Sequence, residues 1–474
     1  MIVNIDELNE KEKLSCDVCV VGAGPAGITL SKKIADKGYK VILCEGGSKE
    51  YTEDSQNCYK GSVEGDYYFQ LDYSRLRYFG GSSNHWGGWC RYFEEVDFDR
   101  SYLDPEFKWP INKKDIDLYL EEACSILEIE KKFDEKIYKN LDIKKISFNI
   151  SDVNFGEKYF NFIKESKNIK LILNSNLIDI NLNNKRTESL IFSSFQKKKI
   201  EVAAKTFVLS MGGIENSRIL LWFYEKYKDN LCNKEIPIGK YWMEHPHFTI
   251  ADAVVNKEVL KAKHFSILKD AQINEKILGC SFTIDEHNYE VSKKLLADLL
   301  CVAPKLGEKM LDSFNKKLVC GVKLYSAWEQ FPDKNNQINL SKIEFDKFGI
   351  PRTILKWKKK ELDRKTIEKS FNILDNWLKN SNLGRFRVEQ WIGNKEKYPE
   401  DDMIAGHHHM GGTRMGNDLN NSVVDKNCKL HGNHNIYICG SSVFRTGGYN
   451  NPTLPIIQLS LRLANYINEE LKLA

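Results

Sequence analysis

The sequence predicts an α/β protein with a nucleotide-binding unit near its start and a second, substrate-facing unit in its later half. A short apolar run at residues 18–21 leads into a glycine-rich turn, a helical pattern and another apolar run. A second strand, glycine turn and helix begin at residue 206, and from residue 248 strand-like runs alternate with long charged helical patterns. Alternation of this kind is typical of sheets covered by helices.

Length and composition narrow the class of protein. The 474 residues suffice for two or three structural units. Lys and Arg number 70 against 66 Asp and Glu, and a net charge of +4 is too weak to favour nucleic acid or an anionic membrane as partner. No apolar run reaches the roughly 18 residues of a membrane-spanning helix, and the first residues lack a signal-peptide pattern. We therefore expect a cytoplasmic protein.

The 12 cysteines are scattered along the chain, which favours buried reduced thiols over a disulfide framework. Cys16 and Cys19 are spaced like a redox pair or half of a zinc site. Because no second pair follows and both precede a glycine turn, burial in a strand and its approach is the favoured interpretation.

The first glycine turn has the spacing of a Rossmann-like βαβ unit. Strand 18–21 is followed by Gly22-Ala23-Gly24-Pro25-Ala26-Gly27, a helix over residues 28–37, a strand at 41–44 and then Glu45. In such units the first glycine permits a tight turn, the second lets the backbone approach a pyrophosphate, and the third lets helix and strand pack closely. The free N–H groups of the helix start bind the phosphates. Glu45 would accept hydrogen bonds from ribose hydroxyls, which favours NAD or FAD over NADP.

A second glycine-rich stretch lies at residues 78–89. It contains four glycines among aromatic residues and His85, a composition that suits a loop lying against a flat ligand. Further on, the patterns predict an amphipathic helix within 112–135, strands at 169–180, 190–202 and 206–210, and a helix over 214–222. Between 248 and 400 we expect strands at 318–326, 335–341 and 353–357 and a helix at 361–378.

The C-terminal segment contains three consecutive histidines, His407, His408 and His409. Adjacent residues rarely point at one ion and no carboxylate or cysteine lies at ligand spacing, so we expect no metal. One histidine is a candidate catalytic base. A strand at 436–440 and a helix from Pro455 to about Leu471 close the chain.

Several motifs, taken together and in order, resemble the glucose–methanol–choline (GMC) flavoprotein oxidoreductases. The resemblance covers nearly the whole chain. Its elements are the turn 22–27 with Glu45, the flavin loop 80–86, the segments 109–111, 174–177, 210–218 and 239–246, and the active-site elements 409–413 and 451–453.

The resemblance implies an FAD-binding domain and an α+β substrate domain built on an antiparallel sheet. The expected boundaries are 1–247 for the FAD domain with its flavin loop at 78–90, 248–400 for the substrate domain, and 401–474 for a return to the FAD domain. The expected cofactor-binding residues are Gly22, Gly24, Pro25, Ala26, Gly27, Glu45, Gly80, Gly81, Ser82, Asn84, His85, Leu177, Gly440, Ser441, Asn451, Pro452 and Thr453.

The resemblance also implies oxidation of CH–OH to C=O, with hydride passing to flavin N5 and a base taking the hydroxyl proton. His409 is the expected base because it stands four residues before Thr413, with His408 as the alternative, and Asn451 holds the second catalytic position. In the loop 80–86, His85 stands where pyranose oxidase joins the flavin covalently, so a covalent link is a hypothesis.

The substrate expected from this resemblance is a sugar, an amino sugar or another polyol. The electron acceptor stays open between oxygen, a quinone and a redox protein. Two other activities also remain, a redox-neutral lyase on the same fold and an NAD-dependent alcohol dehydrogenase. The flavin loop and the two C-terminal elements argue against the NAD-dependent enzyme.

Overall fold

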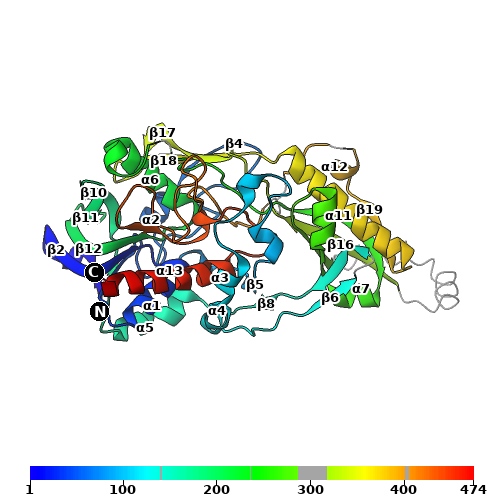
Figure 1. Ribbon diagram of the computed structural model, residues 1–474, viewed down its shortest axis with the longest axis horizontal. Coiled ribbons are helices and arrows are strands. Elements are labelled where there is room, and N and C mark those ends of the chain that lie inside the picture. The colour runs from blue at the N-terminus through cyan, green and yellow to red at the C-terminus, as the bar shows by residue number, and fades with distance from the viewer. Residues whose placement is uncertain (139–140, 235, 287–317, 395, 401–404, 474) are drawn as a thin grey trace.

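The computed structural model describes residues 1–138, 141–234, 236–286, 318–394, 396–400 and 405–473. Two large sheets lie one after the other along the long axis of the molecule, as Figure 1 shows. Both chain termini lie at the end that carries the first sheet. Each sheet has its own hydrophobic core. The predicted combination of a Rossmann-like domain and a second domain on an antiparallel sheet is confirmed.

The first sheet has eight strands, and its central part is parallel. Strand order is β1-β9-β3-β2-β12-β11-β10, with β20 paired to β12. The pairs from β1 to β12 are parallel, as is β12 with β20, whereas β10, β11 and β12 form an antiparallel meander. The strands are β1 (Ile2–Asn4), β2 (Glu12–Val21), β3 (Val41–Cys44), β9 (Ile169–Leu173), β10 (Asn176–Asn183), β11 (Arg186–Ser193), β12 (Lys199–Leu209) and β20 (Ile436–Ile438).

Four helices pack around this sheet. Helices α1 (Pro25–Ala35) and α13 (Thr453–Leu473) contact each other along their length, so the first and last long helices of the chain share one core. Helix α5 (Phe155–Glu165) packs beside α1, and α6 (Gly212–Tyr227) begins directly after β12. This arrangement brings the start of α1 and the start of α13 close to the carboxyl ends of the parallel strands, where open α/β sheets bind ligands.

The second sheet has seven strands and is antiparallel throughout. In order they are β19 (Gly384–Val388), β13 (His247–Asn256), β16 (Leu318–Trp328), β15 (Cys280–Glu286), β14 (His264–Ile267), β7 (Ile143–Ile146) and β6 (Glu135–Tyr138). Helix α11 (Glu361–Asn380) covers this sheet. Its apolar residues recur at helical spacing, and among them Ile367, Leu374 and Leu378 are fully buried.

Each of the two domains contains strands from the part of the chain that the predicted boundaries assign to the other. Strands β6 and β7 complete the second sheet although they precede residue 247. In the opposite direction, β17 (Gln337–Phe345) and β18 (Pro351–Trp357) form a three-stranded sheet with β4 (Gly61–Gly65), next to α6. The expected boundary at residue 401 lies outside the described residues. A division at 247 therefore does not separate the two cores.

Three predicted elements differ from the structure. The helix expected within 112–135 is two short helices, α3 (Lys113–Asp117) and α4 (Leu120–Leu127). The strand expected at 169–180 is interrupted at Asn174, whose φ of 57° turns the chain. The strand expected at 190–202 is a hairpin, because Ser194 accepts hydrogen bonds from the backbone N–H groups of Gln196 and Lys198 and reverses the chain.

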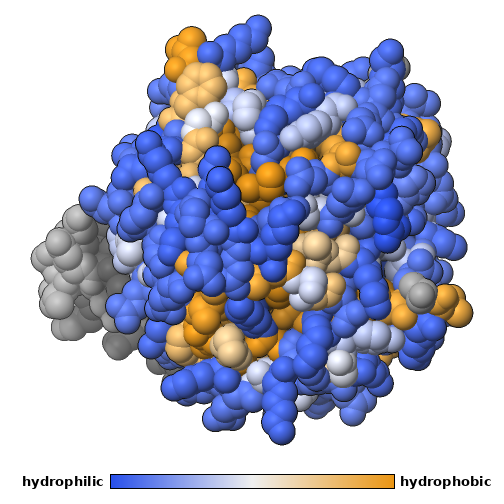
Figure 2. All heavy atoms as spheres, turned by 90° about the vertical axis from the view of Figure 1, so that its left-hand side faces the viewer, coloured by the Kyte–Doolittle hydropathy of each residue, from blue (hydrophilic) through white to orange (hydrophobic). Residues whose placement is uncertain are grey.

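The remaining elements are short. They are α2 (Glu53–Asn57), α7 (Lys257–Ala262), α8 (Lys269–Glu275), α12 (Gln390–Gly393), β5 (Trp89–Cys90), β8 (Asn149–Ile150), and several 3-10 turns, including Gly81–Asn84 and Ser441–Val443. Among the described residues, no helix is long and apolar enough to cross a membrane. The face at the terminal end of the molecule is mostly hydrophilic, and its hydrophobic residues form separate patches (Figure 2).

Candidate active site

The glycine turn after β2 has the geometry that its sequence predicts. Gly22 has φ of 100°, a conformation that favours glycine. A Cβ on Gly27 would lie 2.0 Å from the carbonyl oxygen of Gly22, so only glycine lets α1 pack this closely on the turn. A Cβ on Gly24 would have no atom within 4 Å and would project into open space. Gly24 is also the N-cap of α1 and makes no side-chain capping bond, which leaves the first N–H groups of the helix free to bind an anion.

Glu45 lies beside this turn, at the carboxyl end of β3. Its two carboxylate oxygens accept hydrogen bonds from the backbone N–H groups of Ala23 and Gly47, each at 2.8 Å, and the residue is 6% exposed. These bonds hold the carboxylate in place. Each oxygen keeps one lone pair, so the ribose contact that the sequence predicts stays open.

A cavity of about 850 Å³ begins at the glycine turn and reaches the three histidines. Its volume lies in the upper part of the range of ligand sites. Most of the predicted site residues line it, namely Gly22, Gly24, Pro25, Ala26, Glu45, Gly81, Ser82, His85, Leu177, His408, His409, Gly440, Ser441, Asn451, Pro452 and Thr453. Segments hundreds of residues apart in the sequence thus meet at one site.

Three predicted cofactor-binding residues do not line the cavity and instead support its walls. Gly27 packs α1 onto the turn, as described above. Gly80 has φ of 94° and lies against the backbone of Gly156. Asn84 donates a hydrogen bond from its amide to the carbonyl oxygen of Phe79 at 2.9 Å, which stabilises the loop internally. These residues support the wall of the cavity from behind its lining.

The structure gives the three adjacent histidines different partners, and His407, with φ of 57°, turns the chain ahead of the other two. The Nε2 atom of His408 lies 3.1 Å from the amide nitrogen of Asn451. The ring of His409 turns the other way, where Nε2 lies 2.9 Å from the hydroxyl of Tyr68 and the ring packs near Trp242. His407 packs on Phe69. Asn451, the second predicted catalytic residue, is therefore paired with His408, the alternative base, and not with His409.

Residues 244 and 245, at the start of the second domain, hold this segment. The Nδ1 atoms of His245 and His408 are 2.8 Å apart. Glu244 accepts hydrogen bonds from the backbone N–H of His408 at 2.6 Å and from the hydroxyl of Tyr68 at 2.5 Å. Both residues are fully buried. Neither was singled out as a site residue from the sequence, because their contacts span more than 160 positions.

Burial controls the protonation of these groups. It lowers the pKa of both His408 and His409 well below the usual value, and neighbouring histidines lower that of His408 further, so the imidazoles are neutral near pH 7. Burial also raises the pKa of Glu244 to about 7, against the hydrogen bonds that favour its ionised form. Neutral imidazole is the form that can accept a proton.

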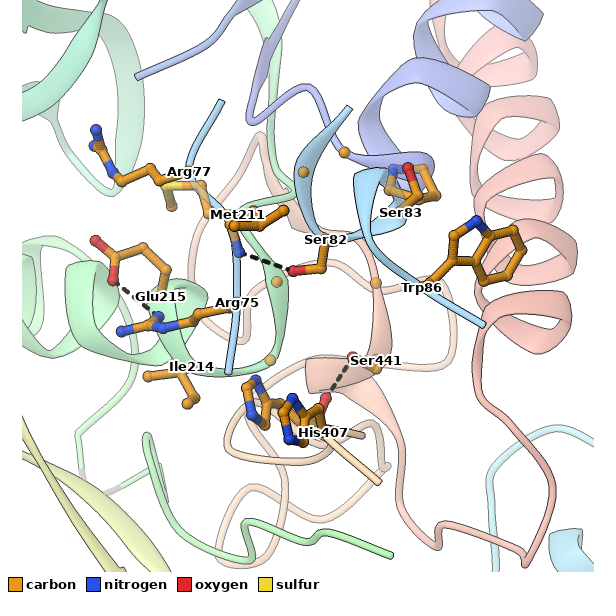
Figure 3. Close-up of a pocket in the computed structure, with 18 of the residues that line it drawn as sticks. Arg75, Arg77, Ser82, Ser83, Trp86, Met211, Ile214, Glu215, His407 and Ser441 are labelled. Atoms are coloured by element: carbon orange, nitrogen blue, oxygen red, sulfur yellow. Dashed lines mark hydrogen bonds and ion pairs between the residues drawn. The ribbon is translucent and has the colours of Figure 1, made fainter. Parts of the chain in front are cut away.

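Figure 3 shows how other segments enclose the cavity. Ser82, Ser83 and Trp86 come from the flavin loop, Met211 to Glu215 from the start of α6, and His407 and Ser441 from the C-terminal segment. Arg75 also points into this region and pairs with Glu215 at 3.4 Å. Glu215 also pairs with Arg218 at 2.8 Å, so two buried arginines share this carboxylate.

Comparison with known proteins identifies this architecture. Residues 332–460 match the family described as GMC oxidoreductase. This segment of the chain is a GMC oxidoreductase C-terminal domain. The chain is similar to the fructose dehydrogenase large subunit of Gluconobacter japonicus, with 26% identity over 60% of this chain and 51% of that protein, so the match spans about half the length of that relative. It is also similar to 2-methyl-1,2-propanediol dehydrogenase of Mycolicibacterium austroafricanum, with 24% identity over 95% of each chain.

Solved structures share the fold of this chain. Pyridoxine 4-oxidase from Mesorbium loti superposes with a TM-score of 0.60 at 15% identity, covering 95% of this chain and 99% of that chain. Formate oxidase superposes with a TM-score of 0.58 at 14% identity, covering 98% and 100%. At this identity the likeness concerns the fold alone.

The residues of the cavity fit FAD, the cofactor of the GMC family. The uncapped start of α1 and the open space at Gly24 suit a pyrophosphate, and Glu45 is fixed at the position for a ribose. From this turn the same cavity runs to His85, His408 and Asn451. Among the described residues, no group of three His, Cys, Asp or Glu side chains is placed to hold a metal ion.

Two further residues that line the cavity are not among the predicted site residues. His247, the first residue of β13, and Trp89, in β5, both line the cavity. Trp89 is 36% exposed, and its ring packs edge-on against His264 of the second sheet. Single aromatic or histidine residues carry no local motif, so only the fold reveals their position.

Proposed function

We propose that this chain oxidises a hydroxyl group of a sugar or another polyol, CH–OH to C=O, with FAD bound in the cavity described above. The observation that carries the proposal is the pairing of His408 with Asn451 in the same cavity as the glycine turn at Gly24. A nucleotide site and a neutral imidazole in one enclosed space are the two requirements of this reaction. When bound, FAD supplies the hydride acceptor.

The protein groups manage the proton and the orientation of the substrate. An alcohol gives up hydride readily only as its O–H proton leaves, so a base must lie within hydrogen-bond reach of that oxygen. We assign this role to Nε2 of His408, because Asn451 lies 3.1 Å from it and can hold the same oxygen through its amide. His409 is the weaker candidate, because the Tyr68 hydroxyl donates its hydrogen to Glu244 and so accepts from Nε2–H of His409, which leaves that nitrogen no lone pair for a proton.

The names of the relatives and the cavity wall support a hydroxylated substrate. Fructose dehydrogenase and 2-methyl-1,2-propanediol dehydrogenase are named for a sugar and a diol. The cavity wall includes Trp86, Trp89 and His247, a combination of aromatic faces and polar ring atoms that suits a sugar ring.

His85 is proposed to contact the flavin, with a covalent link as the finer hypothesis. It lines the cavity, is partly buried, and burial lowers its pKa. A neutral imidazole keeps a nitrogen lone pair, which is what bond formation to the ring system requires.

The test adds a panel of sugars, amino sugars and polyols under anaerobic conditions. Flavin reduction is measured as loss of the yellow flavin absorbance. We expect at least one substrate to bleach the flavin. His408→Ala should slow this step by about 10²- to 10⁴-fold while the flavin stays bound, and His409→Ala should slow it less. A larger effect of His409→Ala would overturn the assignment of the base, and failure of every hydroxyl compound to bleach the wild-type protein would overturn the oxidation.

A further inference from the structure

The contact between His245 and His408 defines where the protons on both rings are. Their Nδ1 atoms are 2.8 Å apart, and the ring planes are nearly perpendicular, at 85°. At this distance a hydrogen bond forms only when one of the two nitrogens carries a hydrogen and the other does not. The question is which ring is the donor.

A backbone carbonyl settles the direction. On the far side of His245, Nε2 lies 3.3 Å from the carbonyl oxygen of Gly447. A carbonyl oxygen can only accept, so the hydrogen of His245 resides on Nε2. Burial lowers the pKa of His245 to about 4, so its ring is neutral near pH 7 and carries no second hydrogen. Nδ1 of His245 is therefore an acceptor, and Nδ1 of His408 must be the donor.

We propose that His245 is a positioning residue that keeps the proton of His408 on Nδ1, so that Nε2 of His408 faces the substrate as a free base. This inference rests on the proposed function. The bonds run in one direction, from Nδ1–H of His408 to Nδ1 of His245, and from Nε2–H of His245 to the oxygen of Gly447. Without substrate, the amide of Asn451 donates to the bare Nε2 of His408, in agreement with their distance of 3.1 Å, and the substrate hydroxyl takes the place of this bond when it reaches Nε2.

The same arrangement also serves the reaction itself. When Nε2 of His408 takes the hydroxyl proton, the ring becomes a cation that keeps its Nδ1–H bond to a neutral, polarisable imidazole. In the described part of the chain, no carboxylate is recorded against either ring, so this charge is stabilised by His245 and by the peptide dipole at Gly447. The other titratable groups near His408 are His247, His407 and His409, together with Glu244 at its backbone N–H.

The decisive measurement is the tautomer of His408 in the holoprotein with ¹⁵N-labelled histidine. The chain has 10 histidines, and comparison with His408→Gln assigns the signal of His408. We expect a ring nitrogen shift of a protonated Nδ1 and an unprotonated Nε2. In His245→Leu the Nε2–H form of His408 should appear, whereas His245→Asn, which keeps an acceptor near the same place, should retain the wild-type tautomer.

Kinetics give the second readout. His245→Leu should lower the limiting rate of flavin reduction at least about tenfold with little change in KM, and His245→Asn should recover most of the rate. His431→Leu is the matched control, because the Nε2 atom of His431 also faces a backbone carbonyl, that of Gly416 at 3.2 Å, but outside the cavity. It should change neither the tautomer nor the rate.

Failure of this inference is distinct from failure of the proposed function. An Nε2–H tautomer of His408 in the wild-type protein overturns it even in an active enzyme, and so does an unchanged tautomer in a folded His245→Leu protein. If His245→Leu does not fold, the wild-type tautomer alone decides. Absence of flavin reduction by any hydroxyl compound would instead refute the proposed function and leave the tautomer measurable.

Discussion

Adding a single methyl group to Gly24 or to Gly27, three positions apart in one turn, should affect the protein in different ways. A Cβ on Gly27 would lie 2.0 Å from the carbonyl oxygen of Gly22 and 2.6 Å from Oγ of Ser210, distances that real Cβ atoms essentially never show. The turn or α1 must shift by about 1 Å, and overpacking of this kind costs typically 1–3 kcal/mol or more. We therefore expect Gly27→Ala to lower the free energy of unfolding by about 3 kcal/mol.

Gly24→Ala should leave the fold intact and weaken FAD binding. Its Cβ meets no atom within 4 Å and enters the space proposed for the pyrophosphate. Loss of one charge-assisted hydrogen bond to a phosphate costs about 2 kcal/mol, which corresponds to about 30-fold weaker binding.

The assay combines urea melts of both apoproteins with titration of FAD. A His85→Ala background allows the cofactor to be removed whichever way it is held. Gly24→Ala is the control in the urea melts, because its fold should stay intact while Gly27→Ala loses stability. Wild-type FAD affinity in Gly24→Ala, or wild-type stability in Gly27→Ala, would refute the geometry argued for this turn.

Three further predictions concern protonation, the covalent link and the catalytic amide. The pKa of Glu244 is raised from 4.5 to about 7, so its protonated form contributes stability that is fully present below pH 4.5 and is lost as the pH rises through 7. Urea melts should show the wild type losing about 3 kcal/mol of unfolding free energy relative to Glu244→Gln over this pH range. A constant difference between the two proteins would mean that the carboxyl titrates normally. Acid denaturation and filtration should retain yellow colour with the wild-type polypeptide and release it from His85→Ala if the covalent hypothesis holds; colour in the wild-type filtrate would exclude the link. Asn451→Ala should slow flavin reduction in stopped-flow measurements while FAD stays bound, and an unchanged rate would make Asn451 a structural residue only.

The sequence is most informative where function depends on local geometry. The turn from Gly22 to Gly27 belongs to a single βαβ unit. The spacing of its residues alone therefore predicts the strand before the turn, the helix after it and the acid at residue 45. Residues 190–202 are predicted as one strand, whereas the structure has a hairpin between β11 and β12. The sequence does not indicate this turn, because it contains serine and lysine and neither glycine nor proline, the usual turn signals.

The choice among three adjacent histidines could not be made from their order. All three histidines line the cavity, and what each ring contacts depends on partners elsewhere in the chain. Here the partners are His245 and Asn451 for His408, and Tyr68 for His409. The interval from Tyr68 to His409 is 341 residues, a contact that exists only once both domains have folded.

The exchange of strands between the two domains limits how the enzyme can be rebuilt. Residues 248–400 look like a replaceable module, yet β6 and β7 at one edge of its sheet belong to an earlier part of the chain, and β17 and β18 pair with β4 of the first domain. A chimaera made by grafting this block from a relative would have to match foreign strands at both places. We expect new substrate preferences to arise more readily through single side chains on the cavity wall than through recombination of whole blocks.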